Sequence, residues 1–213
     1  MPTKYTLTVR NESTQFQNLC VYQQAVDLGV RNVMSLAWLT APAWPHTTVT
    51  FEWNLDYSFT WSYTGALKPG VKFRAQEVRR ANPQDLTANQ VLFDYSDGAH
   101  RFLDGRAFGT AELGNLYIRE LPSVPADGAA VGIGMSNSGV FAVQAQPNEN
   151  LVFTPHPSYW LTAGTYSHGE VLDIEQITNS AQLNYDAGFE LNALLRPDNT
   201  WSVNSGPASL LAA

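Results

Sequence analysis

The stretch from 48 to 65, TVTFEWNLDYSFTWSYTG, places a hydrophobic residue at every odd position from Val49 to Tyr63 and a polar residue at every even one. Because β-strand side chains alternate between two faces, this period of two predicts strands with one buried face. About sixteen extended residues would span roughly 50 Å, well beyond the usual strand. A two-residue hairpin loop would reverse the buried parity, which holds throughout. We expect one long bent strand or two strands joined by an odd-length loop such as 54–56, and we favour a bend that places each half in a different sheet.

Shorter versions of the same pattern occur along the rest of the chain. Segments such as KYTLTVR, NLYIREL and AQLNYD predict about 10–13 short strands separated by turn residues, with a helical turn only at PQDLTAN. Short strands at this spacing are typical of packed antiparallel sheets. We therefore expect an all-β fold with little helix, as a single-domain antiparallel β-sandwich or a partly closed barrel. The domain covers residues 1–213, with 205–213 as a loose C-terminal tail.

The charge balance limits the classes of partner. The chain has 12 Lys and Arg against 19 Asp and Glu, for a net charge of −7. Without a basic surface to neutralise phosphates, nucleic acid and membrane surfaces are not expected partners. The N-terminus lacks the apolar run of a secretory signal, and no segment has the roughly 18 apolar residues that span a bilayer. We expect a cytoplasmic protein, with non-classical export as the open alternative.

Two polar motifs are expected to be structural. Cys20 is the single cysteine, which fits a reducing compartment, and its strand-like surroundings predict a buried thiol. Asn11, Glu12 and Ser13 match the N-glycosylation pattern, but without a secretory signal they predict only a turn.

The sequence offers no set of catalytic or metal-binding residues. Of the four histidines, only His168 has a carboxylate at a suitable spacing, at Glu170, so we expect no metal and no cofactor. The nearest stretch to a serine-hydrolase elbow, GMSNSG, is a hairpin turn without the flanking strand and helix. A glycosidase needs two facing carboxylates, and the sequence does not pair any of its candidates: Asp97, Asp104, Glu112 and Glu120. We expect a non-enzymatic protein, with a hydrolase as the least favoured alternative.

Two proline-flanked aromatic stretches are candidate binding loops. Exposed Trp and Tyr rings on β-sandwich loops can stack on sugars, and APAWPH and HPSYW carry such rings. The candidate ligand-binding residues are Trp44, His46, His156, Tyr159 and Trp160. The alternative that these rings only fill the ends of a sandwich stays open.

Two further features suggest close packing and association. Gly132 and Gly134 leave one face of a strand without side chains, which indicates that something lies against it, a facing aromatic ring in preference to a ligand. Low surface charge and many strands favour association through sheet edges or flat faces. We therefore expect a homo-oligomer.

The segments SLAWLT, FTWSYTG and VGIGMSNSGVFAVQAQPNENLVFTPHPSYWLTAGTY resemble the bacterial RhiA family, and the resemblance runs from KYTLTVRNES to DNTWSV. These are strand and turn segments, so the resemblance identifies no site residue. It implies an abundant soluble bacterial protein under quorum-sensing control in the rhizosphere, without an established activity. We expect an interaction or self-associating protein in a bacterium's contacts with a host or neighbours. A carbohydrate or small-ligand binding module is the alternative.

Overall fold

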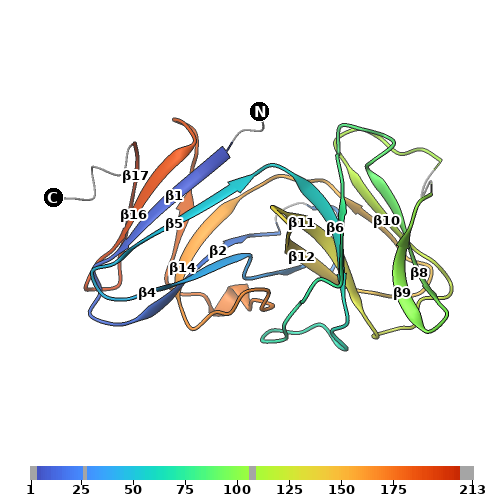
Figure 1. Cartoon of the computed structure of the whole chain (residues 1–213), viewed down its shortest axis with the longest axis horizontal. Helices are drawn as coiled ribbons and strands as arrows, with labels where there is room; N and C mark the ends of the chain where they lie inside the picture. Colours follow the sequence, from blue (N-terminus) through green and yellow to red (C-terminus); the bar gives the residue numbers. More distant parts are fainter. Residues whose placement is uncertain (1–3, 26–27, 106–108, 207–213) are drawn as a thin grey trace.

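The computed structural model describes residues 4–25, 28–105 and 109–206 (Figure 1). This part of the chain forms seventeen strands and one short 3-10 helix, η1 (Ile174–Gln176), which confirms the all-β expectation. The strands outnumber the 10–13 predicted because some, such as β3 (Met34–Ser35), are too short to show alternation.

The first two sheets pack face to face in what we call the first sandwich, on the left of Figure 1. One sheet has the order β17-β16-β1-β5 and contains β1 (Lys4–Asn11), β5 (Thr48–Asn54), β16 (Glu190–Leu195) and β17 (Trp201–Ser205). The other has the order β15-β14-β2-β4 and contains β2 (Gln17–Gln23), β4 (Leu39–Ala43), β14 (Tyr159–Gly164) and β15 (Ser180–Leu183).

The other two sheets form the second sandwich, on the right of Figure 1. One has the order β3-β12-β11-β6-β7, with β6 (Tyr57–Ser62), β7 (Glu77–Arg80), β11 (Ala130–Met135) and β12 (Ser138–Gln144) beside β3. The other has the order β13-β10-β8-β9 and contains β8 (Gln90–Ser96), β9 (Ala99–Leu103), β10 (Leu116–Glu120) and β13 (Asn150–Phe153). Each of the four sheets in the described chain is open, so none is a closed barrel.

One hydrophobic core cluster draws residues from all four sheets, including Leu7, Leu19, Phe59 and Phe93. Most pairings are antiparallel, as expected, but β1 pairs in parallel with β16 and β8 in parallel with β10. β1 and β16 are far apart in the sequence, and β8 and β10 are separated by β9. Local alternation carries no information about such pairings.

The alternating stretch forms two strands in different sheets, as favoured, with a break at residues 55–56 in place of one continuous bent strand. β5 pairs with β1 in the first sandwich, and β6 pairs with β11 in the second (Figure 1). Trp53, Phe59 and Trp61 are buried as predicted, whereas Tyr63 is 51% exposed beyond the end of β6. The polar face of β6 is also buried, and a second core cluster around Leu36 and Phe73 includes Ala130, the β11 partner of Ser62.

The bend between β5 and β6 is held by the turn that follows β11. The Asn54 amide donates to Ser136 Oγ at 3.0 Å, and the Ser136 amide donates to Asp56 Oδ1 at 3.0 Å. The elbow therefore has hydrogen-bond partners on both sides of Leu55.

The glycine pair on β11 has a different cause from the expected one. A Cβ atom on Gly132 would overlap the carbonyl oxygen of Phe141, and one on Gly134 would lie 2.5 Å from the carbonyl oxygen of Ser138. The register shifts between Ile133 and Gly134, as in a β-bulge. The closest neighbour of both glycines is therefore the backbone of β12, in place of the expected aromatic ring or ligand.

Three local expectations are also corrected. Pro42 lies inside β4, where an edge strand tolerates a residue without an amide proton. The stretch 83–89 forms turns without a helix. β17 extends to Ser205, so the predicted tail does not begin there, and residues 207–213 lie outside the described part of the chain.

Candidate functional site

A tight turn at one end of the first sandwich positions Trp44 and His46. The Thr47 amide donates to the Trp44 carbonyl at 3.1 Å, Pro45 occupies the second position, and His46 has a φ of 62° at the third. Proline at the second position and a positive φ at the third define a type II turn, in which Gly or Asn is usual at the third. A histidine in this left-handed conformation requires support from its surroundings.

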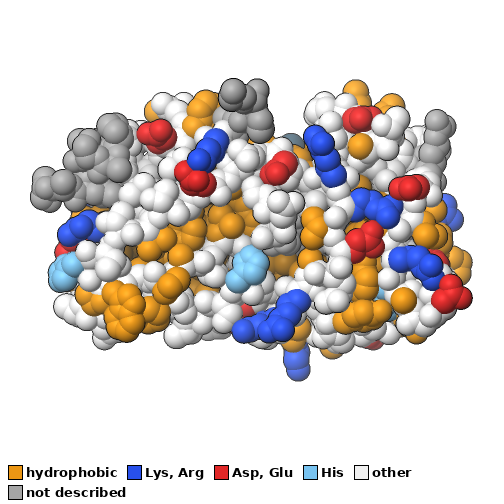
Figure 2. Space-filling view, viewed as in Figure 1, with side chains coloured by type: hydrophobic (Ala, Val, Ile, Leu, Met, Phe, Trp, Pro, Cys, Tyr) orange, Lys and Arg blue, Asp and Glu red, His pale blue; other side chains and the backbone are white. Residues whose placement is uncertain are grey.

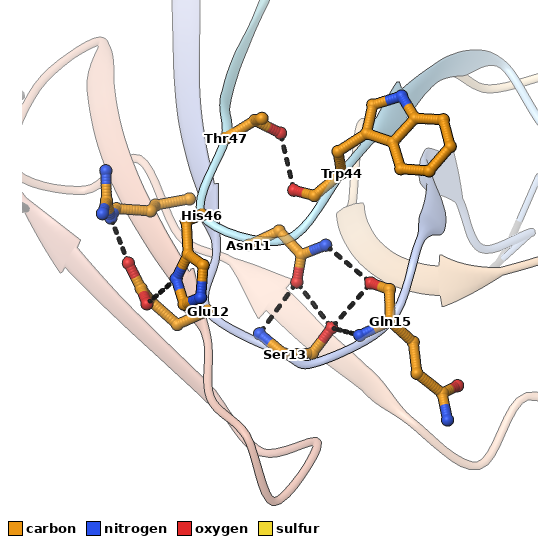
Figure 3. Close-up of polar contacts among 8 residues, drawn as sticks. Asn11, Glu12, Ser13, Gln15, Trp44, His46 and Thr47 are labelled. Carbon is orange, nitrogen blue, oxygen red and sulfur yellow. Dashed lines mark hydrogen bonds and ion pairs between the residues drawn. The ribbon is translucent and has the colours of Figure 1, made fainter.

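Asn11, at the end of β1, holds this turn from below (Figure 3). Its side-chain amide donates to the carbonyls of Ala43 and Gln15 at 3.0 and 3.1 Å, and its Oδ1 accepts from the Ser13 amide and hydroxyl. Asn11 is fully buried. The predicted turn is therefore present, and the Asn11 nitrogen of the glycosylation pattern is already hydrogen-bonded inside it.

Glu12 supports His46 from the other side of the turn. The Glu12 carboxylate lies 2.7 Å from His46 Nδ1 and also pairs with the Arg10 guanidinium. Its contacts with His46 first, and with Arg10 second, hold the pKa of the Glu12 carboxyl below its usual value. In Figure 3 the His46 ring and the Trp44 indole point to opposite sides of the turn. His46 thus stabilises the turn and lies apart from the exposed face of Trp44.

Trp44 forms an exposed aromatic pair with Phe16. Trp44 is 65% exposed and Phe16 is 44% exposed, and their ring centroids lie 4.8 Å apart at an angle of 58°. Phe16 directly precedes β2 and Trp44 directly follows β4, so both lie beyond the terminal backbone pair of these strands, Gln17 with Ala43. Figure 2 shows hydrophobic side chains standing out from the surface at this end of β4, at the lower left. We call these two residues the aromatic pair.

The second predicted stretch lies at the opposite end of the same sheet. Tyr159 pairs with Gln23 at the far end of β2, and its ring packs against Trp38 and Trp53, so that Tyr159 is only 5% exposed. Trp160 points to the other face, where it is half-buried beside Cys20. The structure therefore joins Trp44 and His46 in one turn but separates them from Tyr159, Trp160 and the exposed His156.

Three aromatic residues near Tyr159 were not predicted from the sequence as site candidates. Tyr5, at the start of β1, makes edge contacts with Tyr185 at 5.0 Å and with Phe189 at 5.4 Å between ring centroids. Tyr5 also lies 5.9 Å from Tyr159. Each ring belongs to a segment that alternates like the others, so no local signal distinguishes it from ordinary core.

Two titratable groups are buried inside the second sandwich. Glu120 is 1% exposed, and its Oε2 accepts the Gln146 amide at 3.0 Å while Oε1 has no partner. Burial raises the pKa of Glu120 to about 8. His100 is stacked on Phe93 with neither ring nitrogen hydrogen-bonded, and burial lowers its pKa. Both groups are enclosed, which closes them to a substrate.

The remaining sequence candidates have structural partners or lie apart. Asp97 pairs with Arg101 and Asp104 with Arg79, at 3.0 and 2.9 Å. Cys20 is buried as predicted, and burial raises the pKa of its thiol. Within the described ranges, no group of three His, Cys, Asp or Glu side chains is arranged to hold a metal ion. No helix in this part of the chain has the length and hydrophobicity to cross a membrane.

Comparisons with known proteins add a family match. A family model described as RhiA matches residues 2–206. The chain is 39% identical over 206 residues to Protein RhiA of Rhizobium leguminosarum bv. viciae, a match that covers 95% of this chain and 87% of that protein. No solved structure matches the chain.

Proposed function

The chain belongs to the RhiA family, and from this premise we propose that it is a non-enzymatic protein that binds carbohydrate through the aromatic pair. The observation that carries the proposal is the exposure of Trp44 on a turn fixed by buried hydrogen bonds. A large aromatic ring is normally buried, and one that is held in solvent by a rigid scaffold is typical of a recognition surface.

The chemistry of the aromatic pair suits a sugar ring. The C–H faces of a pyranose pack on an indole or phenyl face, and hydroxyl groups bind amides at the rim. Two tilted rings 4.8 Å apart offer a short shelf, and the exposed Gln15 lies next to Phe16. Because the Asn11 hydrogen bonds fix the turn before binding, little conformational entropy is lost on binding.

An oligosaccharide array, followed by titration of intrinsic tryptophan fluorescence, tests this proposal. We expect at least one oligosaccharide to bind, and Trp44→Ala to weaken binding about tenfold or more, which corresponds to about 1.4 kcal/mol. Leu113→Ala is the matched control, because Leu113 is equally a large exposed hydrophobic side chain but lies on another loop. Absence of binding across the array, or equal binding by Trp44→Ala, would refute the proposal.

Self-association is the second candidate function, and the same exposed pair favours it. Two copies that contact through Phe16 and Trp44 would bury both rings and stabilise a dimer. Light scattering after size exclusion separates the candidates, because a dimer that dissociates in Trp44→Ala without any sugar present supports self-association. A monomer at high concentration removes this candidate and leaves carbohydrate binding.

The biological setting is part of the proposal. We propose expression under quorum-sensing control in a bacterium that lives near plant roots, with the protein in the cytoplasm and non-classical export as the alternative. Transcript measurement with and without the signal molecule, and fractionation of cells and medium, test the two halves separately. Unchanged transcripts would refute the first, and recovery of the protein from the medium of intact cells would refute the second.

A further inference from the structure

A groove of about 340 Å³ opens at the end of the first sandwich opposite the aromatic pair. It lies where β1 begins and β5 ends, close to the start of β14 (Figure 1). Its lining includes the half-buried rings of Tyr5 and Tyr185 and the buried Tyr159, together with Leu55 and Asp186. This volume lies at the lower end of the range for small-molecule sites.

The tyrosine lining is held in place by the fold. The Tyr185 hydroxyl donates to the carbonyl of Thr6 at 3.2 Å, and its ring packs edge-on against Tyr5. Tyr159 is anchored in β14. The groove is therefore formed before any ligand arrives, and its aromatic surface cannot collapse without loss of core contacts.

The polar part of the groove has one sign of charge. Among the described lining residues, Asp186 is the one charged side chain, and Ser158, Gln182 and Asn184 supply neutral hydrogen-bonding groups. The whole chain carries a net charge of −7. An anionic ligand would therefore be repelled, while a neutral or cationic one would be accepted.

We propose that this groove binds an amino sugar, a pyranose ring that carries a protonated amine. The C–H face of the ring packs against the partly exposed Tyr5 and Tyr185, the hydroxyl groups bind the Gln182 and Asn184 amides, and the ammonium group pairs with Asp186. The groove and the aromatic pair lie at opposite ends of β1, roughly 20 Å apart at the rise of a strand. This inference does not rest on the carbohydrate site proposed at Trp44.

Saturation-transfer NMR with D-glucosamine and D-glucose at pH 6.5 tests the inference, because the two sugars differ only at C2, where glucosamine carries an ammonium group and glucose a hydroxyl. We expect glucosamine to bind about fivefold more tightly than glucose, the value for one exposed charge pair. Asp186→Asn should make the two affinities equal. Asp173→Asn is the matched control, since Asp173 is also exposed but lies beside η1, and it should keep the preference.

The outcomes distinguish this groove from the aromatic pair. Trp44→Ala should leave glucosamine binding unchanged, so loss of binding in that variant would place the sugar at the wrong end and overturn the inference. Absence of glucosamine binding, equal affinity for the two sugars in the unmodified protein, or a preference that survives Asp186→Asn would each overturn it as well. A loss of preference in Asp173→Asn would show attraction to net charge and also refute the site.

Discussion

At one end of the first sandwich Trp44 is 65% exposed, and at the other end Tyr159 is 5% exposed. Both aromatic residues lie close to a proline in the sequence, yet Trp44 opens a turn after the edge strand β4, while Tyr159 begins a central strand with its ring directed inward. The position of an aromatic residue relative to the end of its strand therefore decides whether its ring is buried in the core or exposed to solvent.

The largest expected effect is on the free energy of unfolding, which should differ between variants at Tyr159 and at Trp44. Tyr159→Ala should lower the free energy of unfolding by about 3–5 kcal/mol, because it removes a ring packed between Trp38 and Trp53. Trp44→Ala should change it by less than about 0.5 kcal/mol. Urea unfolding followed by circular dichroism measures both. Similar values for the two variants would contradict the comparison.

A smaller loss of stability is expected for a substitution at Asn11, which contacts the Trp44 turn and lies far from Tyr159. Asn11→Ala should lower the free energy of unfolding by about 2–3 kcal/mol, since it leaves the buried Ala43 carbonyl without its side-chain donor. Amide hydrogen exchange should increase in the turn from Trp44 to Thr47. Asn184→Ala, an exposed amide at the opposite end, is the control and should alter neither quantity.

Alkaline pH should lower the stability of the end of the first sandwich that carries Tyr159. Burial raises the pKa of Tyr57 to about 12 and raises the pKa of Tyr159 further. Because the unfolded chain loses these protons from about pH 10, stability falls as the pH rises above that value. Tyr57→Phe should move the midpoint of alkaline unfolding to higher pH, as measured by fluorescence. An unchanged midpoint would show that Tyr57 ionises without unfolding the chain.

Acid should act on the exposed end, with the smallest effect. The pKa of Glu12 is lowered by His46 and then by Arg10, so the stabilisation is present above the usual carboxyl pKa and is lost as the pH falls through the lower folded value. NMR titration of the Glu12 side chain should show that lowered pKa. In Glu12→Gln the turn amides should lose their response to acid, whereas Glu52→Gln, at the Lys4 pair, should keep it.

The sequence predicted those features that depend on local alternation. The parity of the 48–65 stretch predicted the burial of Trp53, Phe59 and Trp61, and its length favoured a bend, but the sequence left open whether it forms one bent strand or two. The parity of SYWLT is uninformative, because Tyr159 and Trp160 are both aromatic although they point to opposite faces. Alternation distinguishes faces only where polar and hydrophobic residues differ.

The tyrosine groove could not be predicted for a different reason. Tyr5, Tyr159 and Tyr185 come from segments at the start and towards the end of the chain, and they meet through the β1–β16 and β2–β14 pairings. Such long-range register is set by the whole core rather than by any one segment. The turn at Trp44 could be predicted because proline marks it in the local sequence. The supporting roles of Asn11 and Glu12 could not, because their contacts with the turn appear only in the folded structure.

The uninterrupted passage of the backbone from β5 into β6 has a mechanical consequence. A force that pulls the two sandwiches apart would act on this passage and on the other chain segments that cross between them, with the β1–β5 and β6–β11 ladders loaded in shear. Ladders sheared along their length break many hydrogen bonds together, unlike hairpins that unzip one pair at a time. Because Ser136 holds the bend between β5 and β6 with two hydrogen bonds, we expect the two sandwiches to resist separation under force.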